Sequence, residues 1–230
     1  ALAGAMDISE EQATEKLAGL LARLRTARER NHVQPARDDK LLVDWNGFAI
    51  SALARAGQSL GRPDYLSAAR RAADFILKEM RDAGRLRHFY AGGAAYGNGF
   101  LDDYASLIAG LLDLHAATDE AGWLQEAEAL TGSVMEHFWD PEDAGFFFTS
   151  DDHERLLARP KEYTDLPVPS GNAMMALNLT QLDRRLGQPG WRDLSRRTLE
   201  RFGGAMARSA QGLSHMLLAL SEFVIKNVRW

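Results

Sequence analysis

Two adjacent carboxylates, Asp102 and Asp103, lie at the predicted start of a helix over 101–117. Carboxylates in a first turn commonly cap the helix, because they accept hydrogen bonds from free backbone N–H groups and complement the helix dipole. The alternative is chemistry: neighbouring helical residues point about 100° apart, so one acid can cap while the other faces a cavity. Asp102 stands where caps usually stand, so we expect it to cap and Asp103 to face inward.

Glycoside hydrolysis would need a second acid. The two carboxyl groups must flank the scissile bond about 5 to 9.5 Å apart, which neighbours on one helix cannot easily do. Asp44, Glu162 and Asp165 could each supply the partner, and no local motif chooses among them. Hydrolysis therefore stays open.

Three polar residues recur at matching positions. Asn46, Asp103 and Asn172 precede an aromatic residue (Tyr65, Trp123 and Trp191) by 19, 20 and 19 residues. Carboxylates and amides on one rim, with Trp45, Tyr104 and Phe100 beside them, are typical of a sugar site. The simpler interpretation is that Ser170-Gly171-Asn172 caps a helix after Pro169 and that Trp45 belongs to the core.

The six histidines show no HxH or HExxH spacing, so we expect no metal site. His88 lies in a predicted strand, and His215 lies at the start of the last predicted helix. Imidazole suits proton transfer near neutral pH, although a structural role is the simpler interpretation for each histidine. Glycine-rich turns such as Gly97-Asn98-Gly99 do not follow a strand in a βαβ unit, so we expect no cofactor.

Helical periodicity and Gly/Pro punctuation predict eight helices. They cover residues 9–30, 46–60, 64–80, 101–117, 122–138, 171–186, 191–206 and 213–226. Two short runs, 85–90 and 145–149, have the character of strands.

Helices of two kinds alternate along the chain. The segments 46–60, 104–118, 170–182 and 212–225 carry at most one charged residue each, whereas 62–82 and 190–208 are rich in charge. A helix that is apolar nearly all round is buried, and one with a single apolar stripe lies outside. Repeated outer and inner helices predict an all-α fold: an incomplete α/α toroid of about four hairpins in a single domain over 1–230, with short strands in its loops. A six-hairpin ring would need roughly 350 residues at this period.

Composition excludes several classes of protein. The net charge is −5 with no basic block, so we expect no nucleic-acid partner. The apolar runs are too short to cross a bilayer, and residues 1–6 do not form a signal peptide, so we expect no membrane partner. There is no cysteine, which excludes disulfides and thiolate metal sites, and we expect the cytoplasm.

Several ordered motifs resemble one known family. They are 38–47, 99–105, 138–141 with 145–149, and 151–154 through 159–162 to 169–172. Together they resemble the bacterial YyaL and animal spermatogenesis-associated protein 20 family. That resemblance implies a thioredoxin-like module followed by a six-hairpin, glycosidase-like toroid related to N-acylglucosamine 2-epimerases. We expect no thioredoxin-like module within residues 1–230, and residues 163–168 depart from the family pattern before its Pro-Ser-Gly-Asn.

Two functions remain open. The first is a carbohydrate-binding or carbohydrate-processing domain, glycosidase-like or epimerase-like, with its site on the rim of the inner-helix N-termini. Its predicted catalytic residues are Asp103 and His215, because epimerase-like toroids can use histidines as acid and base. The predicted substrate-binding residues are Trp45, Asn46, Asp102, Tyr104, Glu162, Ser170 and Asn172. The second is a non-catalytic scaffold or interaction domain of a redox-associated protein.

A missing neighbour should leave an apolar flank on inner helices such as 171–186, which have almost no charged face. Large exposed apolar patches usually find a partner. We therefore expect a homodimer, or contact with a missing neighbouring domain.

Overall fold

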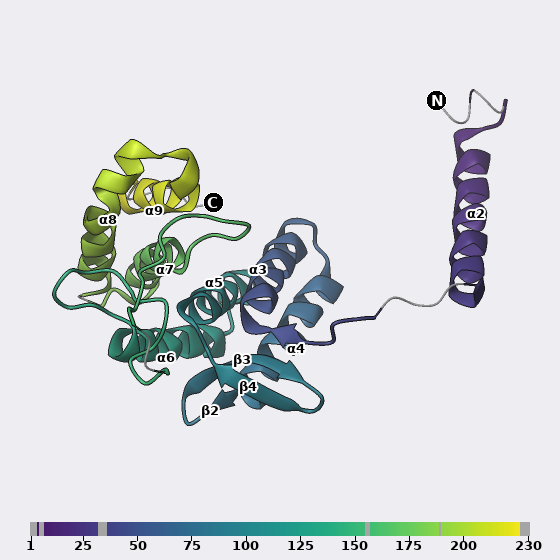
Figure 1. The fold of residues 1–230 in the computed structure, drawn as a ribbon. Coiled ribbons are helices and arrows are strands. Elements are labelled where there is room, and N and C mark those ends of the chain that lie inside the picture. The colour runs from purple at the N-terminus through teal and green to yellow at the C-terminus, as the bar shows by residue number, and fades with distance from the viewer. Residues whose placement is uncertain (1–3, 5–6, 32–35, 155–156, 189, 226–230) are drawn as a thin grey trace. The chain divides into compact units, whose positions relative to one another are not determined.

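The computed structural model describes residues 4, 7–31, 36–154, 157–188 and 190–225. The chain divides into two compact units, Ala1–Asp39 and Lys40–Trp230 (Figure 1). The first unit contains helix α2 (Glu10–Asn31). Ser9 and Gln12 form a reciprocal cap at its start, which explains why the helix predicted from Ser9 begins one residue later. Its leucine stripe is exposed within this unit.

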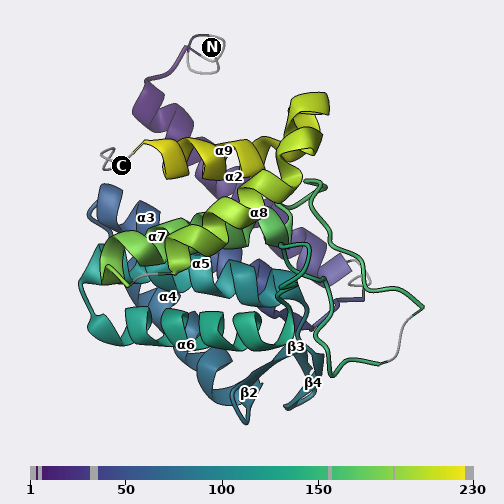
Figure 2. The same cartoon turned by 90° about the vertical axis from the view of Figure 1, so that its left-hand side faces the viewer.

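The second unit consists of helical hairpins. Its helices are α3 (Val43–Ser59), α4 (Pro63–Glu79), α5 (Leu101–Thr118), α6 (Ala121–His137), α7 (Gly171–Leu186), α8 (Trp191–Arg208) and α9 (Ser214–Val224), the last preceded by a 3₁₀ turn, Gln211–Leu213. Helices α3, α5, α7 and α9 neighbour one another in that order, while α4, α6 and α8 pack on their outer side. Figure 2 shows α6, α5 and α7 lying in rows. The predicted alternation of inner and outer helices is confirmed.

The inner helices run parallel. Ser51 of α3 contacts Asp113 of α5, and farther along both helices Gln58 contacts Ala116. Their close approach depends on glycine. A Cβ on Gly47 would lie 2.7 Å from the backbone N of Leu107, and one on Gly110 would lie 2.8 Å from the Gly47 carbonyl oxygen. The N-terminal ends of the inner helices therefore share one side of the unit, and their C-terminal ends share the other.

A small antiparallel sheet lies between the first two hairpins. It contains β1 (Leu41–Leu42), β2 (Arg81–Asp82), β3 (Arg85–Ala91) and β4 (Ala94–Asn98), and β3 pairs with each of the other three strands. In Figure 1 it lies beside the ends of α4 and α6. The strand predicted over 85–90 is confirmed as β3.

The strand predicted over 145–149 is wrong. A single bridge joins Trp139 and Phe146. The backbone N–H groups of this run bond instead to irregular partners: that of Phe146 to the side chain of Asn172, and that of Phe148 to the carbonyl of Pro160. No neighbouring strand is left to pair with it in the described part of the chain.

The predicted apolar flank on 171–186 is also wrong. Helix α7 contacts α5, α8 and α9, and most of its residues from Gly171 to Leu182 are buried. Large apolar side chains are exposed instead on α3 and α9, at Trp45 (64%), Leu218 (45%) and Val224 (66%). The last helix is predicted over 213–226, and its final residue, 226, lies outside the described residues. None of the described helices is both long and apolar enough to span a bilayer.

Candidate active site

Asp103 ties two helices together. It is the third residue of α5, and its Oδ2 accepts the N–H of the N-cap residue Phe100 at 2.8 Å, as in a capping box. Its Oδ1 accepts the N–H of Asp44, in the first turn of α3, at 3.2 Å. The side chain is 1% exposed. The prediction that Asp102 caps and Asp103 faces the cavity is therefore wrong: Phe100 is the N-cap, so the residue that can reach back to it is Asp103.

His88 completes this arrangement from strand β3. Its Nδ1 lies 2.9 Å from Asp103 Oδ2, and its ring meets Phe100 edge-on at 5.0 Å. The hydrogen bond to Asp103 raises the pKa of His88, and burial opposes this only partly. The imidazole is 29% exposed, and no described residue bonds to its Nε2. Asp103 thus orients a histidine whose second nitrogen is available to a ligand.

Asp102, unlike Asp103, does not cap α5. Its Oδ1 is enclosed and accepts no hydrogen bond from the described residues. Burial, followed by the neighbouring charge of Asp103, raises the pKa of Asp102 to about 6, and the backbone N–H of Gly171 offsets this in part. A side chain at position 171 would collide with Asp102 Oδ1, so glycine there leaves room for the carboxyl group.

Two predicted substrate-binding residues are buried structural groups, and these predictions are wrong. The Tyr104 hydroxyl accepts the N–H of Leu86 at 2.9 Å and lies in the core. Asn172 is 0% exposed. Its amide donates to the carbonyls of Phe146 and Glu162, and its oxygen accepts the N–H of Phe146. Asn172 binds two loops to the start of α7, which uses up the hydrogen-bonding groups that a sugar would need.

Ser170 and His215 belong to a second cap. Ser170 caps α7 by accepting the N–H of Ala173 at 3.3 Å, so the capping interpretation is confirmed. Asp165 accepts the N–H of Ser170 at 3.1 Å and that of His215 at 2.8 Å, which joins the starts of α7 and α9. Burial lowers the pKa of His215. Asp103 and His215, the two predicted catalytic residues, have different partners: Asp103 contacts His88, whereas His215 bonds to Asp165 through its backbone N–H.

The remaining predicted binding residues are Trp45, Asn46 and Glu162. Trp45 is 64% exposed, which excludes the core interpretation. Asn46 donates its amide to the carbonyl of Leu42 at 2.7 Å. Glu162 is exposed, and its charge, like that of Asp44, contributes to the raised pKa of Asp102. We use the name acidic rim for Asp44, Asp102 and Glu162.

Sequence reasoning undervalued His88 and Asp165. His88 was placed correctly in a strand, but its contact with Asp103 joins residues 15 apart across two elements. No local spacing signals such a pair. Asp165 was considered only as a second acid, whereas it bonds residues at the starts of two helices. Asp165 lies in the loop before α7 and also bonds to the start of α9. Because loops lack the regular spacing of helices and strands, the sequence pattern does not indicate such a contact.

One group of metal-capable side chains occurs within the described residues: His137, Asp151 and Asp152. Its members come from separate segments, which the sequence spacing could not reveal. His137 Nδ1 lies 2.8 Å from Asp151, and Arg85 binds both oxygens of Asp152. Arg85 lowers the pKa of Asp152 to about 2. These contacts already occupy the carboxylates of the group, and we assign no metal to it.

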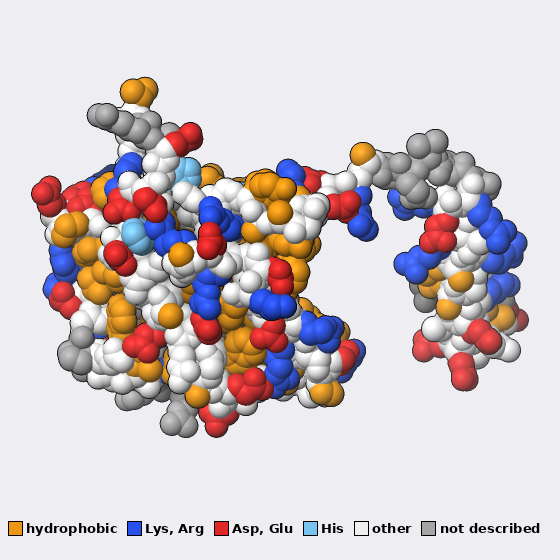
Figure 3. Space-filling view, turned by 90° about the horizontal axis from the view of Figure 1, so that it is seen from below, with side chains coloured by type: hydrophobic (Ala, Val, Ile, Leu, Met, Phe, Trp, Pro, Cys, Tyr) orange, Lys and Arg blue, Asp and Glu red, His pale blue; other side chains and the backbone are white. Residues whose placement is uncertain are grey.

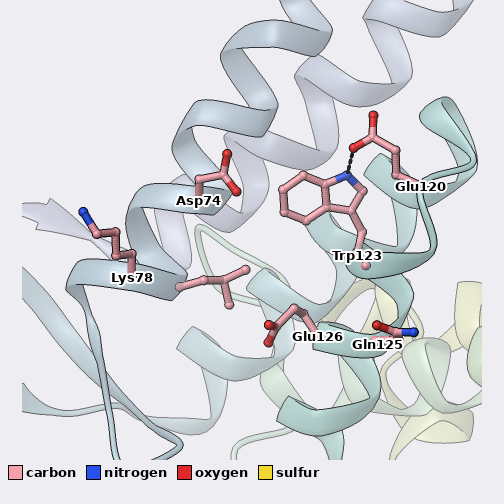
Figure 4. A pocket seen from close by; sticks show the side chains of 8 residues that line it. Asp74, Lys78, Glu120, Trp123, Gln125 and Glu126 are labelled. Atoms are coloured by element: carbon pink, nitrogen blue, oxygen red, sulfur yellow. Dashed lines mark hydrogen bonds between the residues drawn. The ribbon is translucent and has the colours of Figure 1, made fainter.

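The outer surface shows a different hollow. A groove of about 620 Å³ lies between α4 and α6, and none of the predicted site residues lines it. In Figure 4 the indole of Trp123 points into it and donates to Glu120, with Asp74 and Lys78 on the opposite helix. On the face drawn in Figure 3, acidic and basic side chains are interspersed and no large patch of one sign forms.

Known proteins resemble the chain over most of its length. Mouse spermatogenesis-associated protein 20 is 35% identical over 195 residues, 80% of this chain. Human spermatogenesis-associated protein 20 is 35% identical over 199 residues. The chain is homologous to part of spermatogenesis-associated protein 20. It spans about a quarter of the length of these relatives. No protein-family model matches the chain.

Solved structures show the same fold at low sequence identity. A cellobiose 2-epimerase from Spirochaeta thermophila matches 80% of this chain and 53% of its own with a TM-score of 0.66 and 17% identity. A GH76 alpha-mannanase from Bacteroides thetaiotaomicron matches 85% of this chain and 56% of its own with a TM-score of 0.66 and 13% identity. An unsaturated glucuronyl hydrolase specific for heparin matches at 0.62 with 14% identity. The predicted α/α-toroid fold of this spermatogenesis-associated protein 20 homologue is confirmed.

Proposed function

We propose that the chain is the carbohydrate-binding and carbohydrate-processing part of a toroid enzyme, with its site on the acidic rim. The observation that carries this proposal is Asp102: its oxygen Oδ1 is enclosed and has no hydrogen-bond partner among the described residues, and its pKa is raised to about 6. A perturbed carboxyl group of this kind is a candidate general acid near neutral pH. The fold shared with sugar epimerases and glycoside hydrolases supports the substrate class.

Each nearby side chain has a role in this proposal. Asp102, when protonated, donates its proton to an oxygen of the bound sugar. His88 exchanges a proton through Nε2, while Asp103 acts as a positioning residue that holds Nδ1. Trp45 presents an exposed indole on which a sugar ring can stack. Asn46 and Glu162 supply polar groups for hydroxyls. Proton transfer of this type serves both glycosidic cleavage and epimerisation.

The test is a thermal-shift and calorimetric screen with neutral mono- and disaccharides. We expect a sugar that stabilises the chain, and we expect Asp102→Asn and Trp45→Ala each to abolish that stabilisation. Asp74→Asn is the matched control, because Asp74 lies on the outer helix α4 in the groove of Figure 4. A sugar that stabilises Asp102→Asn as much as the wild type would contradict the assignment of the site.

A non-catalytic scaffold is the second candidate, and the capping network favours it. Asp103, Asp165, Ser170 and Asn172 all serve to join helices and loops. In this proposal the exposed apolar residues Trp45 and Leu218 contact a second copy of the chain or a neighbouring domain. Light scattering of the wild type should then show a dimer, and Trp45→Ser with Leu218→Ser should reduce its mass to that of a monomer. A strictly monomeric wild type at high concentration would exclude the homodimer.

A further inference from the structure

A second cavity opens at the opposite end of the inner helices. It has a volume of about 630 Å³ and is lined by the C-terminal halves of α3, α5 and α7 together with α9. Its lining includes three arginines and two carboxylates, together with amide and leucine side chains; the charged residues are Arg55, Arg184, Arg185, Asp113 and Glu222. Because the inner helices run parallel, this cavity and the acidic rim lie at opposite ends of the same helices. The proposed function makes no use of it.

Arg185 supplies a guanidinium with unused donors. One terminal nitrogen, Nη1, donates to the carbonyl and the side-chain oxygen of Gln181, both at 3.2 Å. No described carboxylate lies within 4.0 Å of it, whereas its neighbour Arg184 is paired with Glu222. Burial lowers the pKa of Arg185, so the site holds a partly desolvated cation. A buried charge without a close partner is costly, which favours a ligand of opposite sign.

Arg55 lies across the cavity on α3 and is exposed. None of the described residues forms an ion pair with it. Asp113 interacts electrostatically with both Arg55 and Arg185, and it accepts the hydroxyl of Ser51 at 2.5 Å. Two arginines thus share one carboxylate. Arginines near helix C-termini also complement the helix dipole, but that role leaves their outward donors available.

We propose that this cavity binds the oxyanion group, phosphate or carboxylate, of a small metabolite. The planar fork of N–H donors in a guanidinium group matches two oxygens of a carboxylate or phosphate, and Arg55 and Arg185 approach the cavity from two different helices. Gln58 and Gln181 add amide groups, and Leu177 and Leu218 provide an apolar wall for the remainder of the molecule. The site is independent of the acidic rim.

The experiment is isothermal titration of the whole chain at constant ionic strength. Inorganic phosphate and glucuronate are the two oxyanion probes, and galactose is the neutral comparison. We expect saturable binding of at least one oxyanion and none of galactose at this site. Preference for phosphate or for glucuronate identifies which oxyanion the cavity takes. Arg55→Gln should weaken binding about tenfold or more, since a charge-assisted hydrogen bond contributes about 1.5–3 kcal/mol.

Controls separate the cavity from general charge effects. Arg71→Gln removes an exposed arginine of the outer helix α4 and should leave binding unchanged. Arg185→Gln should weaken binding at least as much as Arg55→Gln, and Arg55→Gln remains informative if that more buried variant does not fold. Absence of saturable binding by both oxyanions, or equal binding by wild type and Arg55→Gln, would overturn the proposal. Neither outcome bears on the sugar screen, whose variants lie at the other end of the helices.

Discussion

The two ends of the inner helices differ in how their charges are used. At the N-terminal ends, free backbone N–H groups attract carboxylates. Asp103 and Asp165 each accept such N–H groups, and each joins the starts of two helices. Asp102 is the acid left over. At the C-terminal ends, Arg55 and Arg185 gather, with Asp113 as their shared counter-charge. A charged residue near a helix end is therefore informative about function only after its structural bonds are known.

The largest expected effect comes from Asp103. Asp103→Asn replaces a carboxylate that accepts from two N–H groups and holds His88. The amide can accept with only one oxygen, so at least one buried partner loses its bond. We expect a loss of about 2–4 kcal/mol in the free energy of unfolding, measured by urea denaturation at pH 7. A loss below 0.5 kcal/mol would show that Asp103 is not a structural tie.

Asp102 should behave in the opposite way, with a dependence on pH. The pKa of Asp102 is about 6 in the folded protein against 3.8 for a solvent-exposed aspartate, so the folded state binds the proton more tightly. Its contribution to stability is present below pH 3.8 and is lost as pH rises through 6, by about 3 kcal/mol in total. Asp102→Asn removes this dependence. The variant should therefore be more stable than the wild type at pH 8.

Urea denaturation of wild type and Asp102→Asn between pH 4.5 and 8 checks this sign. The difference between the two proteins should grow with pH, since other titrating groups cancel in the comparison. An unchanged difference across that range would mean that Asp102 is solvated and not enclosed, and it would weaken the proposed general acid. Asp74→Asn serves as the control, since Asp74 lies on the outer helix α4 and away from the acidic rim.

Asp165 should have a smaller effect than Asp103 because its surroundings are more open. Asp165→Ala removes acceptors for the N–H groups of Ser170 and His215 and for the hydroxyl of Ser214. We expect a loss of about 1–2 kcal/mol, comparable with removal of a helix cap. Hydrogen exchange should locate the loss in the first turns of α7 and α9. Protection lost equally throughout the chain would contradict a local tie.

The sequence allowed the fold to be predicted better than the site. Residues 171–182 of α7 carry no charged side chain because this part of the helix is buried, whereas α4 carries charged residues on its exposed side. This difference in charge distinguished the inner helix from the outer one. Helix-cap chemistry was foreseen at Ser170 and misassigned between Asp102 and Asp103, because the N-cap is Phe100, two residues before the expected Asp102, and Asp103 then occupies the N3 position that bonds back to it. The contact of His88 with Asp103 depends on tertiary packing of β3 against α5, which no local pattern encodes.

The smallest effect on stability should come from Trp45. A change at this residue also tests whether the two ends of the inner helices bind their ligands independently. Its side chain is 64% exposed at the start of α3, so Trp45→Ala should change the free energy of unfolding by no more than about 0.5 kcal/mol. The same change should abolish stabilisation by any sugar that binds the acidic rim, while leaving oxyanion binding at the other end of the helices intact. Calorimetry of one variant with both ligands measures the two results together. Loss of both ligands from a stable Trp45→Ala protein would show that the two ends are coupled rather than independent.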